Sequence, residues 1–358
     1  MNPPVVKQRN NGVVPASTVG RGKVVTLDSL PVTNHWTNGA ISLYHGDSLD
    51  FYGEWDSPAT IVSDGAYGIL GFEGDTSDHL GMPEWYQPHI EAWSSKATGQ
   101  TTLWFWNSEI GWAAVHPVLE RCGWRYVNAN IWNKGLAHIA GNVNTAKIRR
   151  FPVVTEICVQ YVFEPRIDGL TLQHWLYREW KRTGLPMKRA NDACSVKDVA
   201  VRKYLDQGHL WYFPPPEMFA KMATYANEFG RAEGRPYFSL NGIAPGTAED
   251  WAKMRSTFNC PMGTTNVWDR KPLKGSERVK VPEISGKAAH LNQKPLDLMK
   301  MIVSSSSNPS DVVWEPFGGL FSASVACRDI GRRAFAAEID STYFQLGLKR
   351  FYDPDLLI

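Results

Sequence analysis

Short apolar runs alternate with amphipathic stretches through the first half of the chain. Apolar runs of about four to eight residues predict buried strands, and apolar positions that recur every three or four residues predict helices. The predicted strands are residues 41–45, 59–63, 101–106, 126–132 and 156–163. The predicted helices are residues 84–97 and 109–122, the second ended by Gly123. This order is typical of an α/β protein with a mostly parallel sheet that helices cover on both faces.

The pattern changes near residue 165, where strand signals stop and helical periodicity continues to about residue 275. The alternation then resumes with predicted helices at 295–304, 322–330 and 341–351 and predicted strands at 311–314 and 333–338. We therefore expect one sheet, built from both ends of the chain and interrupted by an inserted helical module. The expected parts are a tail (1–27), a first half of the sheet domain (28–164), the insertion (165–275) and a second half of the sheet domain (276–358).

The composition fits a folded protein that needs no disulfides. With 358 residues, 43% of them hydrophobic, and a net charge of +2, the chain can bury a full core unaided. Its five cysteines are scattered, and no Cys or His pair stands at metal-ligand spacing, so we expect reduced thiols, no metal and a cytoplasmic location. The chain has no run of about 18 apolar residues, so we expect no membrane span. The flexible tail carries Lys7, Arg9, Arg21 and Lys23 without an apolar stretch, which is unlike a signal peptide.

Three segments at predicted strand ends carry candidate chemistry, since ligands of open α/β sheets lie beyond the carboxyl ends of the strands. One contains Glu315 and the pair Gly318-Gly319, where glycines let the backbone approach a ligand closely. About twenty residues further on, Glu338 ends a strand, in the place of an acid that binds ribose hydroxyls. These two segments together predict a nucleoside-bearing cofactor, and a nicotinamide-dependent oxidoreductase is one alternative. The third segment is the turn Asp64-Gly65-Ala66-Tyr67.

Four sequence boxes resemble those of the DNA amino-methyltransferases, which transfer a methyl group from S-adenosylmethionine to adenine N6 or cytosine N4. Asp64-Gly65-Ala66-Tyr67 is similar to the family's catalytic Asp/Ser/Asn-Pro-Pro-Tyr. Glu315-Pro316-Phe317-Gly318-Gly319-Leu320-Phe321 is similar to its cofactor loop, Asp-Pro-Phe-x-Gly-x-Gly. His290-Leu291-Asn292-Gln293-Lys294-Pro295 matches His-x-x-Gln-Lys-Pro in full, and Gly46-Asp47-Ser48-Leu49 matches Gly-Asp-x-Leu. The catalytic box precedes the cofactor box, as in the permuted beta group of this family.

The resemblance implies a Rossmann-like fold and a target base that is rotated out of the DNA duplex. Asp64 and the carbonyl of Gly65 would accept hydrogen bonds from the target amino group, and Tyr67 would stack on the base. Glu315 and Lys294 would flank the methionine end of the cofactor, Glu338 its ribose and Asp47 its adenine. The full implied cofactor set is Asp47, His290, Gln293, Lys294, Glu315, Phe317, Gly318, Gly319 and Glu338. An acid at the first motif position favours adenine N6 over cytosine N4.

Two departures from the family pattern leave a second alternative open. Gly65-Ala66 stands where the family has two prolines, which makes the turn softer by about 1 kcal/mol of chain entropy per residue. Phe321 stands where the cofactor loop has its last glycine, so its side chain must be accommodated near the cofactor or turned away. The alternative is a catalytically dead DNA-binding protein on a methyltransferase scaffold.

The insertion occupies the place of the family's target-recognition region, and residues 166–203 contain nine Lys and Arg against four acids. Ser195 and Asp198 resemble a capping box, so one expectation is a helix-turn-helix whose second helix, residues 195–207, enters the major groove. The alternative is a helical bundle whose cations clamp phosphates. The residues expected to contact DNA are Arg182, Lys188, Arg189, Lys197, Arg202 and Lys203. Trp211 to Glu217 are expected to pack the insertion onto the sheet. The expected partner is double-stranded DNA, with a companion restriction endonuclease as a further expectation, and the oligomeric state is left open.

Overall fold

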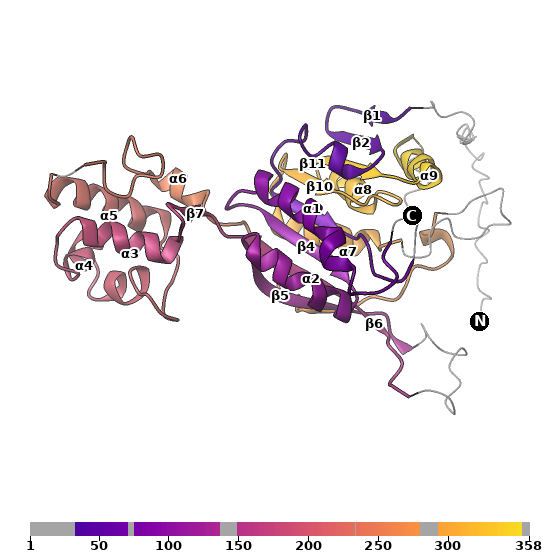
Figure 1. Cartoon of the computed structure of the whole chain (residues 1–358), viewed down its shortest axis with the longest axis horizontal. Coiled ribbons are helices and arrows are strands. Elements are labelled where there is room, and N and C mark those ends of the chain that lie inside the picture. The colour runs from indigo at the N-terminus through magenta and orange to yellow at the C-terminus, as the bar shows by residue number, and fades with distance from the viewer. Residues whose placement is uncertain (1–32, 71–74, 137–148, 233, 280–292, 353–358) are drawn as a thin grey trace, which may run out of the picture.

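The computed structural model describes residues 33–70, 75–136, 149–232, 234–279 and 293–352. One sheet dominates this part of the chain, with the strand order β1-β2-β11-β10-β3-β4-β6-β5-β9 (Figure 1). Its strands are β1 (His35–Thr37), β2 (Ile41–His45), β3 (Thr60–Ser63), β4 (Thr102–Asn107), β5 (Trp124–Asn133), β6 (Thr155–Phe163), β9 (Val267–Asp269), β10 (Val312–Glu315) and β11 (Arg333–Glu338).

Five neighbouring strands, β2, β11, β10, β3 and β4, run parallel to one another. Strand β6 runs antiparallel to both β4 and β5, and β9 runs parallel to β5. The carboxyl ends of the five parallel strands therefore share one edge of the sheet, which we call the carboxyl edge. Since β6 is antiparallel, it begins at the carboxyl edge and ends at the opposite edge.

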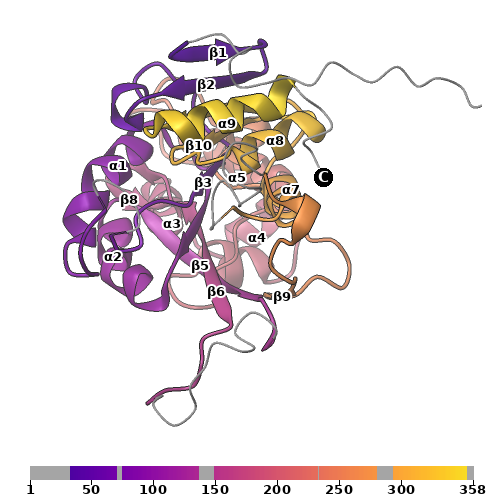
Figure 2. The ribbon, with the colours of Figure 1, turned by 90° about the vertical axis from the view of Figure 1, so that its right-hand side faces the viewer.

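Helices cover both faces of the sheet, as Figure 2 shows. The helices α1 (Met82–Lys96) and α2 (Glu109–Arg121) bury their apolar side chains in the core on one face. The helices α7 (Leu296–Ser306), α8 (Ser322–Asp329) and α9 (Ser341–Tyr352) do so on the other. The α/β fold with a mostly parallel sheet is thus confirmed.

The predicted strands and helices of the sheet domain lie within about two residues of the observed ones, and the strands at 41–45 and 333–338 coincide with β2 and β11. Two strands of this sheet were not expected. Strand β1 pairs antiparallel with β2 at the edge of the sheet. Strand β9 lies in the range expected to be helical, but its buried Trp268 belongs to the core beneath the sheet.

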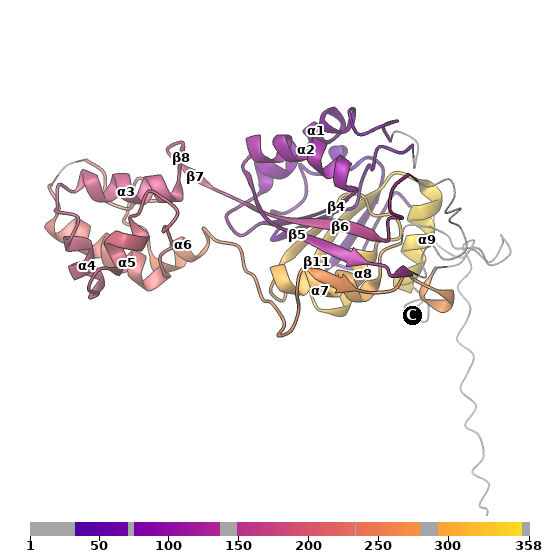
Figure 3. The same ribbon diagram turned by 90° about the horizontal axis from the view of Figure 1, so that it is seen from below.

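Between β6 and β9 the chain forms a helical module with a hydrophobic core of its own (Figures 1 and 3). It contains the strands β7 (Arg166–Ile167) and β8 (Leu170–Thr171) and the helices α3 (Leu172–Arg182), α4 (Arg189–Cys194), α5 (Pro216–Phe229) and α6 (Ala248–Ala252). The expectation that residues 211–217 pack the module onto the sheet is wrong. The ring of Phe213 stacks instead on Trp251 of α6 at 4.6 Å, inside the module's own core.

The module is joined to the edge of the sheet opposite the carboxyl edge. The last residue of β6, Phe163, donates its backbone N–H to the carbonyl of Thr101, just before β4 begins. On the return path, Asn259 donates its backbone N–H to Ser305, near the end of α7. The position of the insertion in the sequence therefore does not place it beside the strand ends that carry the candidate chemistry.

The expected helix-turn-helix is wrong. Helix α4 ends at Ser195, whose φ of +56° lies in the left-handed region, and the chain does not start a new α-helix there. Residues 200–204 form only a short π-helical turn. No capping bond joins Ser195 to Asp198, and Asp198 pairs with Arg202 at 3.4 Å. The Ser-x-x-Asp spacing was misleading because Ser195 caps the end of one helix rather than the start of another.

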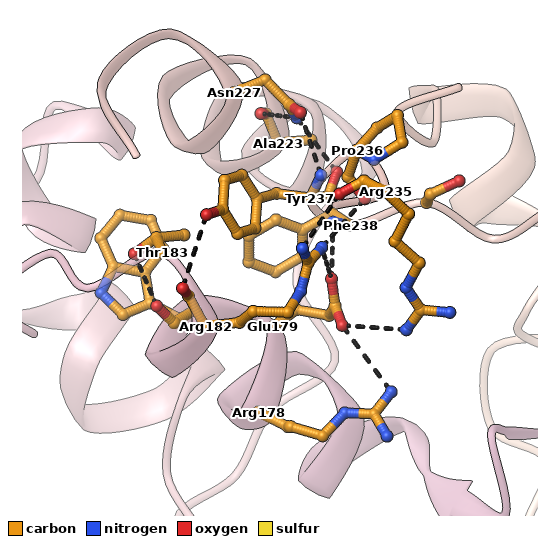
Figure 4. A network of polar contacts seen from close by, with 12 residues as sticks. Arg178, Glu179, Arg182, Thr183, Ala223, Asn227, Arg235, Pro236, Tyr237 and Phe238 are labelled. Atoms are coloured by element: carbon orange, nitrogen blue, oxygen red, sulfur yellow. Dashed lines mark hydrogen bonds and ion pairs between the residues drawn. The ribbon is translucent and has the colours of Figure 1, made fainter. Parts of the chain in front are cut away.

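A buried carboxylate, Glu179 of α3, organises one side of the module (Figure 4). It accepts hydrogen bonds from Arg182 at 2.7 Å, Arg235 at 3.2 Å and the backbone N–H of Phe238 at 3.1 Å. Arg182, which we expected on the DNA-binding surface, also donates to the carbonyls of Arg235 and Pro236. Its guanidinium therefore neutralises a buried charge that would otherwise destabilise the module.

Candidate functional site

Two turns that are far apart in the sequence meet at the carboxyl edge. The turn 64–67 follows β3, and the loop 315–319 follows the neighbouring strand β10. A Cβ atom added at Gly65 would lie 2.6 Å from the ring of Phe317 and 2.8 Å from the hydroxyl oxygen of Tyr86. The two turns are therefore in contact. A side chain at position 65 would have to displace the ring of Phe317 and the hydroxyl of Tyr86, which gives a physical reason why a glycine stands there instead of the family's proline.

The turn 64–67 belongs to a cluster of polar side chains from four segments. The side chain of Lys294 is 4% exposed, and its ammonium lies 2.6 and 2.8 Å from the two carboxylate oxygens of Asp64. It also lies 2.9 Å from Oε1 of Glu156, the second residue of β6. The hydroxyl of Tyr67 lies within donating distance of both acids, 2.8 Å from Asp64 and 2.6 Å from Glu156. Lys134, just after β5, pairs with the other oxygen of Glu156 at 2.8 Å.

The charges of this cluster stabilise one another. Burial alone would lower the pKa of Lys294, but the carboxylates of Asp64 and Glu156 outweigh it and raise that pKa. Burial alone would raise the pKa of Glu156, but Lys294 and Lys134 lower it to about 2. Burial and the two acids raise the pKa of Tyr67. At neutral pH the cluster therefore holds an ammonium, ionised Glu156 and a protonated phenol.

The backbone of the turn offers an acceptor as well. The carbonyl of Ala66 accepts from Asn107 Nδ2 at 2.9 Å and from the Tyr86 hydroxyl at 3.1 Å. Among the residues that the structure describes, no donor reaches the carbonyl of Gly65. Asp64 and the Gly65 carbonyl are thus two acceptors at one turn, the arrangement that an amino group with two N–H bonds requires.

The cofactor side of the site lies at the ends of β10 and β11. Glu338 accepts from the backbone N–H of Gly319 at 2.6 Å and from that of Asp340 at 2.7 Å. Burial raises the pKa of Glu338. Phe317 packs against Trp85 and His89, with ring centroids 5.3 and 4.9 Å apart. A carboxylate at a strand end, a glycine loop bonded to it and a nearby aromatic ring fit a nucleoside.

Glu315 lies deeper than expected for a residue that flanks a ligand. Its two oxygens accept from the backbone N–H groups of Ala323 and Ser324 at 2.9 and 2.7 Å, at the start of α8. The Ser324 hydroxyl donates to it at 2.6 Å. Burial raises the pKa of Glu315 to about 7. In this structure Glu315 anchors the glycine loop to α8, as acids do at helix N-termini.

Phe321 has turned away from the loop into the core. It is fully buried, its φ of +55° is left-handed, and its ring packs edge-on against Phe344 of α9. A Cβ atom added at Gly347 would lie 2.5 Å from this ring, and one at Gly318 would overlap it. The left-handed backbone is the one that glycine adopts most readily, which is consistent with glycine at this position in the family pattern. Phe321, which replaces the family's last loop glycine, is therefore accommodated by packing in the core.

Of the remaining cofactor residues, Asp47 lies beside Glu338 at the carboxyl edge. It follows β2, whose last residue His45 pairs with Glu338 of β11. Its side chain accepts from the backbone N–H of Leu49 at 2.9 Å. Gln293 accepts from the backbone N–H of Val279 at 3.0 Å and so ties the segment before α7 to residues 277–279. His290 and the tail 1–27 lie outside the described residues.

The expected DNA contacts other than Arg182 are exposed on the helical module, where Arg189 pairs with Asp192 at 3.3 Å and Arg202 with Asp198. They are Lys188, Arg189, Lys197, Arg202 and Lys203. None is brought to the carboxyl edge, since the module joins the opposite edge. This placement separates the expected DNA contacts from the turn 64–67.

Sequence reasoning missed Glu156 and Asn107. Asn107 is the last residue of β4, and Glu156 is the second residue of β6. Nothing in the sequence indicates that Glu156 lies near Asp64, which is 92 residues away. Only the direction of β6 in the sheet indicates that Glu156 belongs to the site. An antiparallel strand that begins beside the carboxyl edge delivers its first side chains there.

In the described part of the chain, no group of three or more His, Cys, Asp and Glu side chains is arranged to hold a metal ion. Over the same residues, no helix has the length and hydropathy needed to cross a membrane.

The sheet order and the two contacting turns define a Rossmann-like α/β protein with a site at its carboxyl edge. The sequence matches the DNA methylase family N6_N4_Mtase over residues 59–349, and the chain belongs to this family, whose members use S-adenosylmethionine.

Curated relatives are similar over short segments. Type II methyltransferase M.HinfI of Haemophilus influenzae is 36% identical over 85 residues, 24% of this chain and 23% of that protein. DNA adenine methyltransferase YhdJ of Escherichia coli (strain K12) is 43% identical over 61 residues, 17% of this chain and 21% of that protein. The matches thus span about a quarter or less of these relatives. The PvuII DNA methyltransferase (cytosine-N4-specific) shares the fold, with a TM-score of 0.51, 13% identity and 88% of each chain covered.

Proposed function

We propose that the protein is a sequence-specific DNA methyltransferase that transfers a methyl group from S-adenosylmethionine to the exocyclic amino group of a flipped base. The contact between the turn 64–67 and the loop 315–319 carries this proposal. It brings two hydrogen-bond acceptors next to a glycine loop with a strand-end carboxylate. Family membership over residues 59–349 supports the same reaction.

When bound, S-adenosylmethionine supplies an electrophilic methyl group on a sulfonium. Glu338 would bind the ribose hydroxyls, Phe317 would pack against the cofactor, and Gly318 and Gly319 would admit it closely. Lys294 is committed to Asp64 and Glu156, so we propose that it acts at the target side of the site rather than at the methionine carboxylate.

At the target side, Asp64 and the Gly65 carbonyl would accept the two N–H bonds of the amino group. Both bonds draw the nitrogen out of conjugation with the base and direct its lone pair toward the methyl group. Tyr67 would stack on the base. The rate enhancement would come from proximity and from fixed dipoles, without a covalent intermediate on the protein.

We propose adenine N6 as the target, on the acid at position 64 and on the similarity to a protein named DNA adenine methyltransferase. The exposed cations of the helical module would contact phosphates away from the target base, which positions DNA without reading it. A companion restriction endonuclease stays a prediction.

The test is to incubate the protein with methyl-deuterated S-adenosylmethionine and mixed-sequence DNA, then digest the DNA and analyse its nucleosides by mass spectrometry. We expect deuterated N6-methyladenine. Deuterated N4-methylcytosine would support transfer but contradict the adenine preference. DNA binding without any labelled nucleoside would favour the dead scaffold and refute the proposal.

A further inference from the structure

Glu156 lies in the site without belonging to any of the four sequence boxes. Its side chain is 13% exposed and accepts from three donors, Lys294 at 2.9 Å, Lys134 at 2.8 Å and Tyr67 at 2.6 Å. Two of these donors, Lys294 and Tyr67, also contact Asp64. Glu156 is therefore a second acceptor for the groups that hold the carboxylate expected to bind the substrate.

We propose that Glu156 is a positioning residue for methyl transfer, which takes over the hydrogen bonds of Lys294 and Tyr67 when Asp64 binds the target amino group. This inference rests on the proposed function of Asp64. It assigns a role in the reaction to Glu156, which belongs to none of the four sequence boxes.

The first step concerns Lys294. Its ammonium has three N–H bonds, and both carboxylate oxygens of Asp64 and Oε1 of Glu156 lie within 2.9 Å of it. In this arrangement both oxygens of Asp64 already accept from Lys294, so the target amino group competes with a charged donor. Since Glu156 attracts the same ammonium, Lys294 can give up one bond to Asp64 without becoming an unpaired buried charge.

The second step concerns Tyr67. Its hydroxyl has one proton but lies within reach of Oδ1 of Asp64 and Oε1 of Glu156. It can donate to only one of them at a time. When it donates to Glu156, Oδ1 of Asp64 loses one of its two donors and can accept from the substrate in its place.

The remaining neighbour, Lys134, keeps Glu156 in place. Its ammonium bonds the oxygen of Glu156 that faces away from Lys294, and it also lies 4.6 Å from the ring centroid of Trp132. Glu156 is thus held from one side and offers its other oxygen to the catalytic turn. A neutral amide at position 156 would attract Lys294 far less, so Lys294 would stay on Asp64.

The experiment compares the wild type with Glu156→Gln, which keeps the shape and removes the charge. The matched control is Glu164→Gln, an acid just beyond the other end of β6 whose partner is Arg125 at 3.8 Å. For each variant we would measure kcat for methyl transfer to DNA, and the dissociation constant of S-adenosylmethionine by calorimetry. We expect Glu156→Gln to lower kcat at least tenfold with the dissociation constant within threefold of wild type, and Glu164→Gln to change neither.

A double-mutant cycle separates positioning from general damage. Lys294→Met removes the competing ammonium, so adding Glu156→Gln to it should lower kcat by less than threefold. An equal loss in both backgrounds, a wild-type kcat, or loss of cofactor binding together with kcat would each overturn the inference.

If Glu156→Gln does not fold, Glu156→Asp decides with the same two measurements, because its side chain is one methylene shorter and withdraws the carboxylate from Lys294 and Tyr67. A reduced kcat with unchanged cofactor affinity supports the inference, and a wild-type kcat overturns it. A wild-type protein that transfers no methyl group would instead refute the proposed function itself, so the two failures are distinguishable.

Discussion

Replacing Phe321 by alanine and by glycine separates the two effects that this residue has on stability. Phe321→Ala removes a fully buried ring from the core between α8 and α9, which costs about 3–5 kcal/mol. It also leaves a Cβ atom on a backbone with a φ of +55°, where a non-glycine residue is strained by about 1–2 kcal/mol. Phe321→Gly removes the same ring but relieves the strain. We therefore expect the glycine variant to be more stable than the alanine variant by about 1 kcal/mol.

The assay is equilibrium unfolding of the whole chain in guanidinium chloride, followed by far-ultraviolet circular dichroism. Phe344, which packs against the same ring, is the matched control because it lies inside the helix α9. There the order must reverse, with Phe344→Gly less stable than Phe344→Ala by about 1 kcal/mol. If Phe321→Ala is as stable as Phe321→Gly or more so, the assignment of backbone strain to position 321 is refuted.

Three further predictions concern charge. Burial raises the pKa of Glu315 from 4.5 to about 7, so its protonation contributes about 3 kcal/mol to folding that is fully present below pH 4.5 and is lost as the pH rises through 7. Glu315→Gln should flatten the dependence of the unfolding free energy on pH between 4.5 and 7, and an unchanged pH dependence would contradict the assignment. Glu338→Ala should weaken S-adenosylmethionine binding by about 10- to 100-fold in calorimetry, more than it lowers kcat at saturation. Neutralising Lys197, Arg202 and Lys203 together should reduce the salt slope of DNA binding by about 2 to 3, and an equal slope would place the phosphate contacts elsewhere.

The sheet domain could be predicted from sequence because its signals are local. The strands β2 and β11 are apolar runs bounded by turn residues, and each helix of the sheet domain shows its own periodicity. The carboxyl-edge rule then placed Asp64 and Glu338 at one edge, and the resemblance to a known family supplied their chemistry.

The rest depends on contacts that no local pattern encodes. Glu156 meets Lys294 only because β6 runs antiparallel and starts at the carboxyl edge. The expected helix-turn-helix is absent because Ser195 takes a left-handed conformation that ends α4, and the Ser-x-x-Asp spacing does not reveal this conformation. The basic residues of the insertion indicate a surface that can bind DNA, but they do not indicate where that surface lies. Since β6 ends at the edge opposite the carboxyl edge, the module that carries these residues is joined to that opposite edge.

The central claim is that Asp64 serves the transfer step at a site that also holds the cofactor. The most direct measurement is the single-turnover rate of methyl transfer to DNA by Asp64→Ala, with the dissociation constant of S-adenosylmethionine measured on the same sample. We predict a rate at least about a hundredfold below that of the wild type, with a dissociation constant within about threefold of it. A wild-type rate of transfer by Asp64→Ala would contradict the account.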